Sequence, residues 1–165
     1  MNSNLQFDFL VNKEDKTITV KRAFAAPVDK VWSAWTKSEL LDQWWAPKPY
    51  KAITKSMDFR EGGYWLYAMT GPDGFAQYCR ADYKSIDAGN SYSALDAFCN
   101  ESGEVIDSFP RSLWTNTFSS QSENTLVTIV IKYKEQEDLE KIIEMGFKEG
   151  FTAGLENLDA LLKEI

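Results

Sequence analysis

Histidine is absent from this chain of 165 residues. Its absence removes the side chain that most often serves as a general base and as a metal ligand. A Ser–His–Asp triad and a histidine-ligated metal site are therefore excluded. We expect neither a metal nor a cofactor. An enzyme built on this chain would depend on other groups for proton transfer, namely Asp96, Tyr67, Tyr83 or Arg60.

Basic residues, long apolar runs and cysteines are also scarce. The chain has 18 Lys and Arg against 25 Asp and Glu, and its basic residues are scattered along a sequence with a net charge of −7. Such a protein repels nucleic-acid phosphates and anionic membranes. No run approaches the length of a membrane span, and the polar N-terminal segment lacks the apolar core of a signal peptide. We therefore expect a cytoplasmic protein that binds no nucleic acid, does not insert into membranes, and keeps Cys79 and Cys99 reduced.

Aromatic residues, in contrast, are abundant. Six Trp, seven Tyr and ten Phe make up 14% of the chain. This excess indicates either a bulky core or a lined cavity. The length is that of a single domain, so we expect one domain spanning residues 1–165.

The C-terminal segment carries the clearest helical pattern. Apolar residues recur at intervals of three and four over residues 137–165, without a proline, which predicts one long amphipathic helix. Small residues interrupt its middle at Gly146, Gly150, Ala153 and Gly154. Two explanations are open: the helix packs closely on a sheet there, or the gap is one wall of a ligand cavity.

The rest of the chain predicts strands around two short helices. Residues 16–24, and in one interpretation also 5–10, alternate as strands, and residues 27–36 and 38–44 have the apolar spacing of short helices. Strands joined by turns rich in glycine and asparagine follow near residues 52–59, 64–70, 75–86, 92–99, 113–119 and 125–133. This order predicts an α+β fold, in which a curved antiparallel sheet of about six or seven strands wraps around the C-terminal helix.

Five segments, in order along the chain, resemble one known family. They are RAFAAPVDKVWSAWTKSELLDQWWAP (residues 22–47), DFREGGYW (58–65), MTGPDG (69–74), LDAFCNESG (95–103) and GFTAGLENLDALL (150–162). Together they are similar to the family related to the activator of the heat-shock protein 90 ATPase, within the START-like SRPBCC superfamily. The resemblance implies the helix-grip (Bet v-like) fold, with a hydrophobic cavity between the sheet and the long helix. Superfamily members bind small apolar molecules there, some catalyse reactions, and some act in stress responses.

Side chains that face this cavity should be aromatic or apolar and should share the inner face of the sheet or helix. The predicted ligand-binding set consists of Trp45, Phe59, Trp65, Tyr67, Met69, Tyr83, Phe98, Trp114, Phe118, Phe147 and Phe151. The alternative is that these side chains fill an ordinary core. Of the adjacent pair Trp44 and Trp45, one is expected to pack inward, and the other either packs as well or lies at the mouth of the cavity.

Three charged residues are candidate polar anchors for a ligand. Asp58 and Arg60 lie in a matched segment, and an ion pair between them is the simpler interpretation. Asp96 lies within a predicted strand between Leu95 and Ala97. If it faced inward it would be a buried carboxylate with a raised pKa, but we expect it to face solvent.

The predicted function is the binding of a small hydrophobic molecule without chemistry of its own. One alternative is a co-chaperone-like interaction domain with a chaperone partner, which needs an exposed patch such as Trp44 or Trp45 with residues 47–49. A second alternative is an enzyme, such as a cyclase or hydrolase, acting on an apolar substrate. A homodimer formed through a sheet edge or a helix is also an open alternative.

Overall fold

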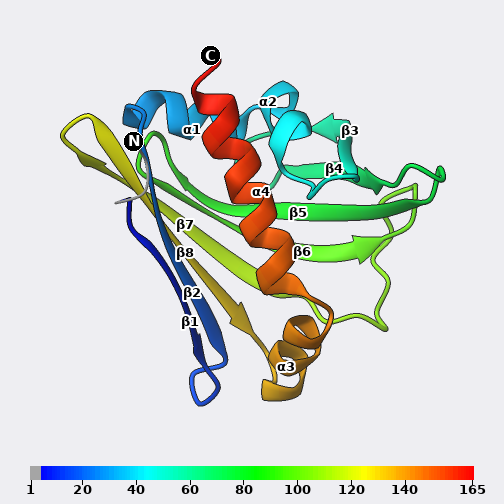
Figure 1. Ribbon diagram of the computed structural model, residues 1–165. Coiled ribbons are helices and arrows are strands. Elements are labelled where there is room, and N and C mark those ends of the chain that lie inside the picture. Colours follow the sequence, from blue (N-terminus) through cyan, green and yellow to red (C-terminus); the bar gives the residue numbers. More distant parts are fainter. Residues whose placement is uncertain (1–4) are drawn as a thin grey trace.

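A curved antiparallel sheet of eight strands forms the frame of the protein, in the order β1-β2-β8-β7-β6-β5-β4-β3 (Figure 1). The computed structural model describes residues 5–165. The strands are β1 (Phe7–Asn12), β2 (Thr17–Phe24), β3 (Lys51–Met57), β4 (Tyr64–Thr70), β5 (Ala76–Asp87), β6 (Ser91–Cys99), β7 (Ser112–Gln121) and β8 (Asn124–Tyr133). The helices are α1 (Val28–Thr36), α2 (Ser38–Trp44), α3 (Gln136–Glu144) and α4 (Phe147–Leu162). The expected α+β helix-grip fold is confirmed, with a slightly larger sheet than predicted because β1 and β2 form an N-terminal hairpin.

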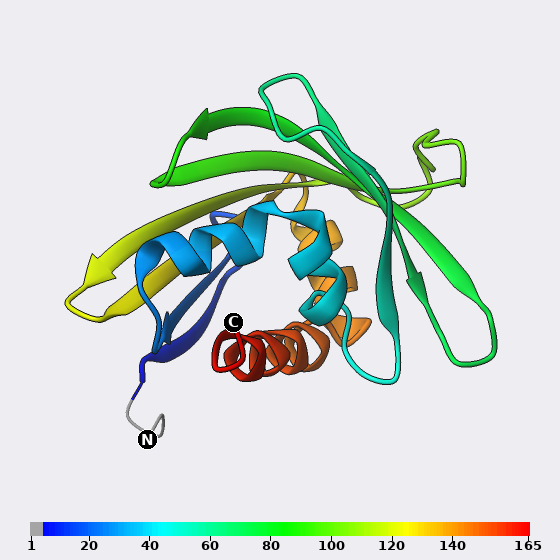
Figure 2. The same cartoon turned by 90° about the horizontal axis from the view of Figure 1, so that it is seen from above.

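Alternation along the strands explains which side of the sheet becomes the core. In β8, Val127, Ile129 and Ile131 are fully buried, while the residues between them are partly exposed. β8 pairs with β2 on one side and β7 on the other, so the last strand of the chain lies inside the sheet and β1 forms one edge. Bulges in β3 and β5 accompany the bend of the other half. All four helices lie on the concave side, as the view from above shows (Figure 2).

The predicted C-terminal helix is in fact two helices, so the expectation of one continuous helix was wrong. Gly146 has a φ of +89°, a left-handed conformation that glycine adopts at no steric cost. At this residue α3 ends and α4 begins in a new direction. Apolar residues recur at intervals of three and four in both helices, so spacing alone could not reveal the break.

The two other helical glycines have different surroundings. A Cβ atom on Gly154 would lie 3.2 Å from the carbonyl oxygen of Trp45, so α4 packs closely at this point, against the end of α2 rather than against the sheet. The Asn157 amide strengthens this contact by donating to the carbonyl of Ala46 at 3.1 Å. A Cβ atom on Gly150 would meet only Pro47, at 3.9 Å, so this glycine adjoins open space. Close packing therefore explains Gly154, although the contact is with α2 and not with the sheet as expected, and open space adjoins Gly150.

Within the part of the chain that the structure describes, no helix combines the length and the apolar character that crossing a membrane requires.

Candidate functional site

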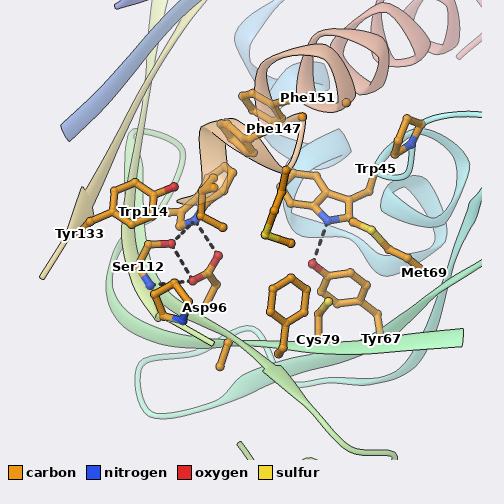
Figure 3. Close-up of a pocket in the computed structure, with 18 residues that line it drawn as sticks. Trp45, Tyr67, Met69, Cys79, Asp96, Ser112, Trp114, Tyr133, Phe147 and Phe151 are labelled. Carbon is orange, nitrogen blue, oxygen red and sulfur yellow. Dashed lines mark hydrogen bonds between the residues drawn. The ribbon is translucent and has the colours of Figure 1, made fainter. Parts of the chain in front are cut away.

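A cavity of about 300 Å³ lies between the concave face of the sheet and the α3–α4 junction (Figure 3). Its lining is mostly aromatic and apolar, and includes Trp45, Pro47, Tyr67, Met69, Cys79, Phe98, Trp114, Tyr133, Ile142, Met145, Phe147 and Phe151. Met145 is 55% exposed, which places the mouth of the cavity beside the break between the two helices. A concave, largely apolar space with a few polar groups is typical of a small-molecule site.

Most of the predicted binding residues lie around this cavity. Those that line it are Trp45, Tyr67, Met69, Phe98, Trp114, Phe147 and Phe151. Trp65 and Tyr83 lie deeper and line a second, smaller pocket of about 50 Å³. Their role in binding stays a prediction, but the alternation of the strands places them on the inner face as expected.

Phe59 and Phe118 are not among the residues that line either space. Phe59 follows the end of β3 and packs its ring edge-to-face against Tyr83, with ring centroids 4.8 Å apart. Phe118 packs against Trp32 of α1 at 5.1 Å. These two phenylalanines lie on the inner side, as predicted, but in a part of the core that α1 fills.

Asp96 faces the cavity, so the expectation of a solvent-facing carboxylate was wrong. Its Oδ1 accepts hydrogen bonds from the Ser112 backbone N–H (2.8 Å) and hydroxyl (2.7 Å), and its Oδ2 accepts one from Trp114 Nε1 (2.9 Å) (Figure 3). Loss of hydration on burial raises the pKa of Asp96 above its ordinary value, although these hydrogen bonds and the charge of Arg111 favour ionisation. Asp96 thus places one carboxyl group, with its donors already arranged, in an apolar wall.

The opposite side of the cavity is polar but uncharged. Trp45 Nε1 donates to the Tyr67 hydroxyl oxygen at 2.9 Å, and the Tyr67 ring stacks on Trp65 with centroids 3.9 Å apart. Burial raises the pKa of Tyr67 well above its ordinary value, and it raises the pKa of the Cys79 thiol to about 12. Both groups therefore remain protonated at neutral pH, and they can offer a ligand hydrogen bonds but no charge.

Asp58 and Arg60 lie outside the cavity. Arg60 Nε donates to Asp58 Oδ2 at 2.6 Å, and the two side chains are 67% and 54% exposed. This is the ion pair that the sequence favoured over a ligand anchor. The two residues follow β3 in the turn before β4, rather than occupying a strand face.

The adjacent tryptophans both point inward. Trp44 is 1% exposed and donates its indole N–H to the carbonyl of Ala34 at 2.9 Å, while Trp45 lines the cavity. The indoles therefore do not form the exposed patch that the co-chaperone alternative requires. Tyr50, five residues after Trp45 in the sequence, is 45% exposed.

Several residues that line the cavity were not predicted from the sequence. Ser112 and Tyr133, at the ends of β7 and β8, continue the inward alternation of Trp114 and Ile131, and this signal could have identified them. Pro47, Pro110 and Met145 lie in connecting segments. The direction of a side chain follows a repeat in the sequence only within a strand or helix, so the sequence could not place these three residues. Within residues 5–165, no cluster of three or more acidic or cysteine side chains is arranged to hold a metal ion.

Comparisons with known proteins agree with this architecture. The family model described as "Activator of Hsp90 ATPase homolog 1-like protein" matches residues 25–163. A crystal structure of a protein from Mycobacterium smegmatis is 31% identical, with a TM-score of 0.87 and 96% of each chain covered. A solution structure from Arthrobacter aurescens is 28% identical, with a TM-score of 0.90 over 96% of this chain and 92% of that one. A third, from Staphylococcus epidermidis, is 30% identical over 93% of each chain, with a TM-score of 0.83. No curated protein matches the sequence.

Proposed function

The chain belongs to the family of proteins like the activator of Hsp90 ATPase homolog 1, and we propose that it binds a small, largely apolar molecule in the cavity at the α3–α4 junction. The observation that carries this proposal is the aromatic lining of the 300 Å³ cavity. A compact core would close such a space, because interiors pack to the density of organic crystals.

Three aromatic side chains of the lining pack against one another. Phe147 and Phe151 stack on one another with centroids 5.3 Å apart, and Trp114 meets both rings edge-on, at 5.9 and 5.5 Å. These contacts hold the rings in place before a ligand arrives, so little side-chain freedom is lost on binding. A ligand that buries about 300 Å² of apolar surface would gain about 7.5 kcal/mol, so its affinity could not exceed about micromolar, because the costs of association reduce this gain.

Native mass spectrometry of the purified protein, repeated after denaturing extraction, tests the proposal. A mass excess that denaturation releases is the expected result, and it would also identify the ligand. Phe147→Ala should reduce the retained mass, because the Phe147 ring lines the cavity. Phe75→Ala is the matched control, because Phe75 lies between β4 and β5, is 59% exposed and does not line the cavity.

The proposal fails if the mass is clean and apolar fluorescent probes also fail to bind to the native protein. Retention that is equal in both phenylalanine variants would place binding elsewhere on the protein.

An enzyme acting on an apolar substrate is the second candidate, supported by the carboxyl group of Asp96 facing the cavity with a raised pKa. Turnover of a bound molecule that is lost in Asp96→Asn, while binding persists, would support the enzyme over the binding protein. Binding without any product, in native protein and variant alike, would remove this candidate.

A further inference from the structure

The smaller pocket contains the strongest unexplained feature of the core. Trp35 and Asn116 line this inner pocket, of about 50 Å³, and not the main cavity. Four residues line both this pocket and the main cavity, namely Trp45, Tyr67, Asp96 and Trp114. The inner pocket thus adjoins the main cavity through a shared wall.

Two polar atoms around the inner pocket are buried without a hydrogen-bond partner: Trp35 Nε1 and Asn116 Oδ1. Trp35 is 1% exposed and Asn116 is 3% exposed. Folded proteins rarely leave such atoms unpaired, because each loses its hydrogen bonds to water without replacement. A polar residue at position 116 is also unusual among the apolar side chains of this inner face, where its cross-strand neighbour is Ile129.

The orientation of the Asn116 amide follows from its other contact. The Tyr92 hydroxyl donates its one proton to the carbonyl of Trp35 at 3.4 Å, and the Asn116 side chain acts toward it as a donor, which partly offsets the rise in the pKa of Tyr92 that burial causes. Since that proton is already used, the tyrosine oxygen must accept from the amide nitrogen of Asn116. The amide oxygen is therefore the atom left free, which agrees with the unpaired Oδ1.

The free atoms are one donor and one acceptor, so the group that suits them must accept and donate at once. A hydroxyl does both. A methyl group would leave both atoms unpaired, an ammonium could not accept from Trp35, and a carboxylate would meet the oxygens of Asn116 and Asp96. A volume of 50 Å³ holds such a group, since about 10–15 Å³ is enough for one water molecule.

We propose that the inner pocket is a subsite for a hydroxyl group, which accepts from Trp35 Nε1 and donates to Asn116 Oδ1. The hydroxyl comes either from a ligand whose apolar body occupies the main cavity or from an ordered water molecule. The ligand source rests on the proposed function, because it requires the main cavity to bind a molecule; the water source does not.

Two probes that differ only in a hydroxyl and a methyl group, p-butylphenol and p-butyltoluene, distinguish the sources. Calorimetric titration of the native protein should give tighter binding of the phenol by about five- to tenfold, the effect of one or two buried hydrogen bonds. Asn116→Leu and Trp35→Phe should each reduce this preference to about twofold or less. Two variants are used so that a folding defect in one leaves the test intact.

Thr125→Val is the matched control. Thr125 is fully buried, and its replacement by valine also exchanges a polar group for an apolar one. The Thr125 hydroxyl, however, donates to the carbonyl of Ala26 at 2.8 Å, and Thr125 lines neither the main cavity nor the inner pocket. The phenol preference should survive in this variant.

A high-resolution crystal structure without added probe tests the water source. An ordered water on Trp35 and Asn116 that disappears in Asn116→Leu, with equal affinities for the two probes, assigns the hydroxyl to water. Equal affinities together with a dry inner pocket overturn the proposal. If neither probe binds to the native protein, the proposed binding function fails. The crystal structure alone then tests the subsite. An ordered water on Trp35 and Asn116 would support the subsite, and a dry inner pocket would overturn it.

Discussion

Gly150 and Gly154, one helical turn apart on α4, offer a test of how this helix is held. Alanine has the highest helix propensity, and replacing a glycine within a helix stabilises it by about 0.8–1 kcal/mol if the added methyl group meets no obstacle. At Gly150 the methyl carbon would have Pro47 as its nearest neighbour, at 3.9 Å, an ordinary van der Waals contact. Gly150→Ala should therefore raise the free energy of unfolding by about 1 kcal/mol.

At Gly154 the same change meets a backbone. The methyl carbon would lie 3.2 Å from the carbonyl oxygen of Trp45 and 3.5 Å from that of Trp44. A backbone cannot turn away as a side chain can, so α4 must shift from α2, and overpacking of this kind costs about 1–3 kcal/mol. This cost equals or exceeds the gain in propensity, so Gly154→Ala should be neutral or destabilise by up to about 2 kcal/mol.

Urea denaturation of the native protein and both variants measures their free energies of unfolding. The value for Gly150→Ala should exceed that for Gly154→Ala by about 1–3 kcal/mol. In a thermal scan, each 1 kcal/mol should move Tm by about 2–4 °C for a chain of this length. A gain in Gly154→Ala equal to that in Gly150→Ala would refute the close contact between α4 and the end of α2.

Three further predictions concern the carboxylates. The raised pKa of Asp96 means that the folded state binds this proton more tightly, so the free energy of unfolding should fall as pH rises from about 4 through the raised pKa. Urea titrations should show that Asp96→Asn lacks this slope, and equal slopes would contradict the assignment. Asp82 should change the free energy of unfolding in the opposite direction with pH. Burial opposes the ionisation of Asp82, but hydrogen bonds from Arg80 and Arg111 lower its pKa below the ordinary value. The stability that Asp82 contributes should therefore be present at neutral pH and lost as pH falls below about 4. Asp82→Asn should cost about 1–3 kcal/mol at pH 7 and converge with the native protein in acid, and a constant difference would count against this ion pair. Asp58→Ala should lower the free energy of unfolding by less than about 1 kcal/mol, because the ion pair of Asp58 with Arg60 is exposed. Calorimetric titration with p-butylphenol should give the native affinity in this variant. A loss of affinity would instead make Asp58 a ligand anchor.

Alternation in the sequence was enough to predict much of the cavity wall. Tyr67 and Met69 share the inner face of β4, and Trp114 faces the same space from β7. A strand side chain points to one face or the other, so the period of two leaves only the choice of face, and the aromatic residues indicate which face is buried.

Asp96 shows how the same rule was misapplied. Phe98 was expected inside and Asp96 outside, but residues two apart on a strand share a face, so the two expectations excluded each other. The outer face of β6 is unusual because the segment that follows the strand covers part of it: Arg80, the cross-strand neighbour of Ala97, donates to the carbonyl of Gly103 at 2.7 Å, and Ala97 is only 6% exposed. With both faces partly covered, polarity does not indicate direction, and a carboxylate can face the interior where Ser112 and Trp114 supply its donors.

The break at Gly146 and the close contact at Gly154 together explain why the cavity stays open. The C-terminal half of α4 buries Leu155, Leu158 and Leu162 in the core and lies against α1 and α2. The N-terminal half starts from the turn at Gly146 and presents Phe147 and Phe151 to the cavity instead. Because α4 is fixed at one end by α2 and at the other by α3, it cannot settle onto the sheet without breaking one of these contacts. The cavity under the first two turns of α4 is therefore a consequence of how this helix is attached. Substitutions of the side chains that line the cavity can alter the ligand it accepts without altering the fold.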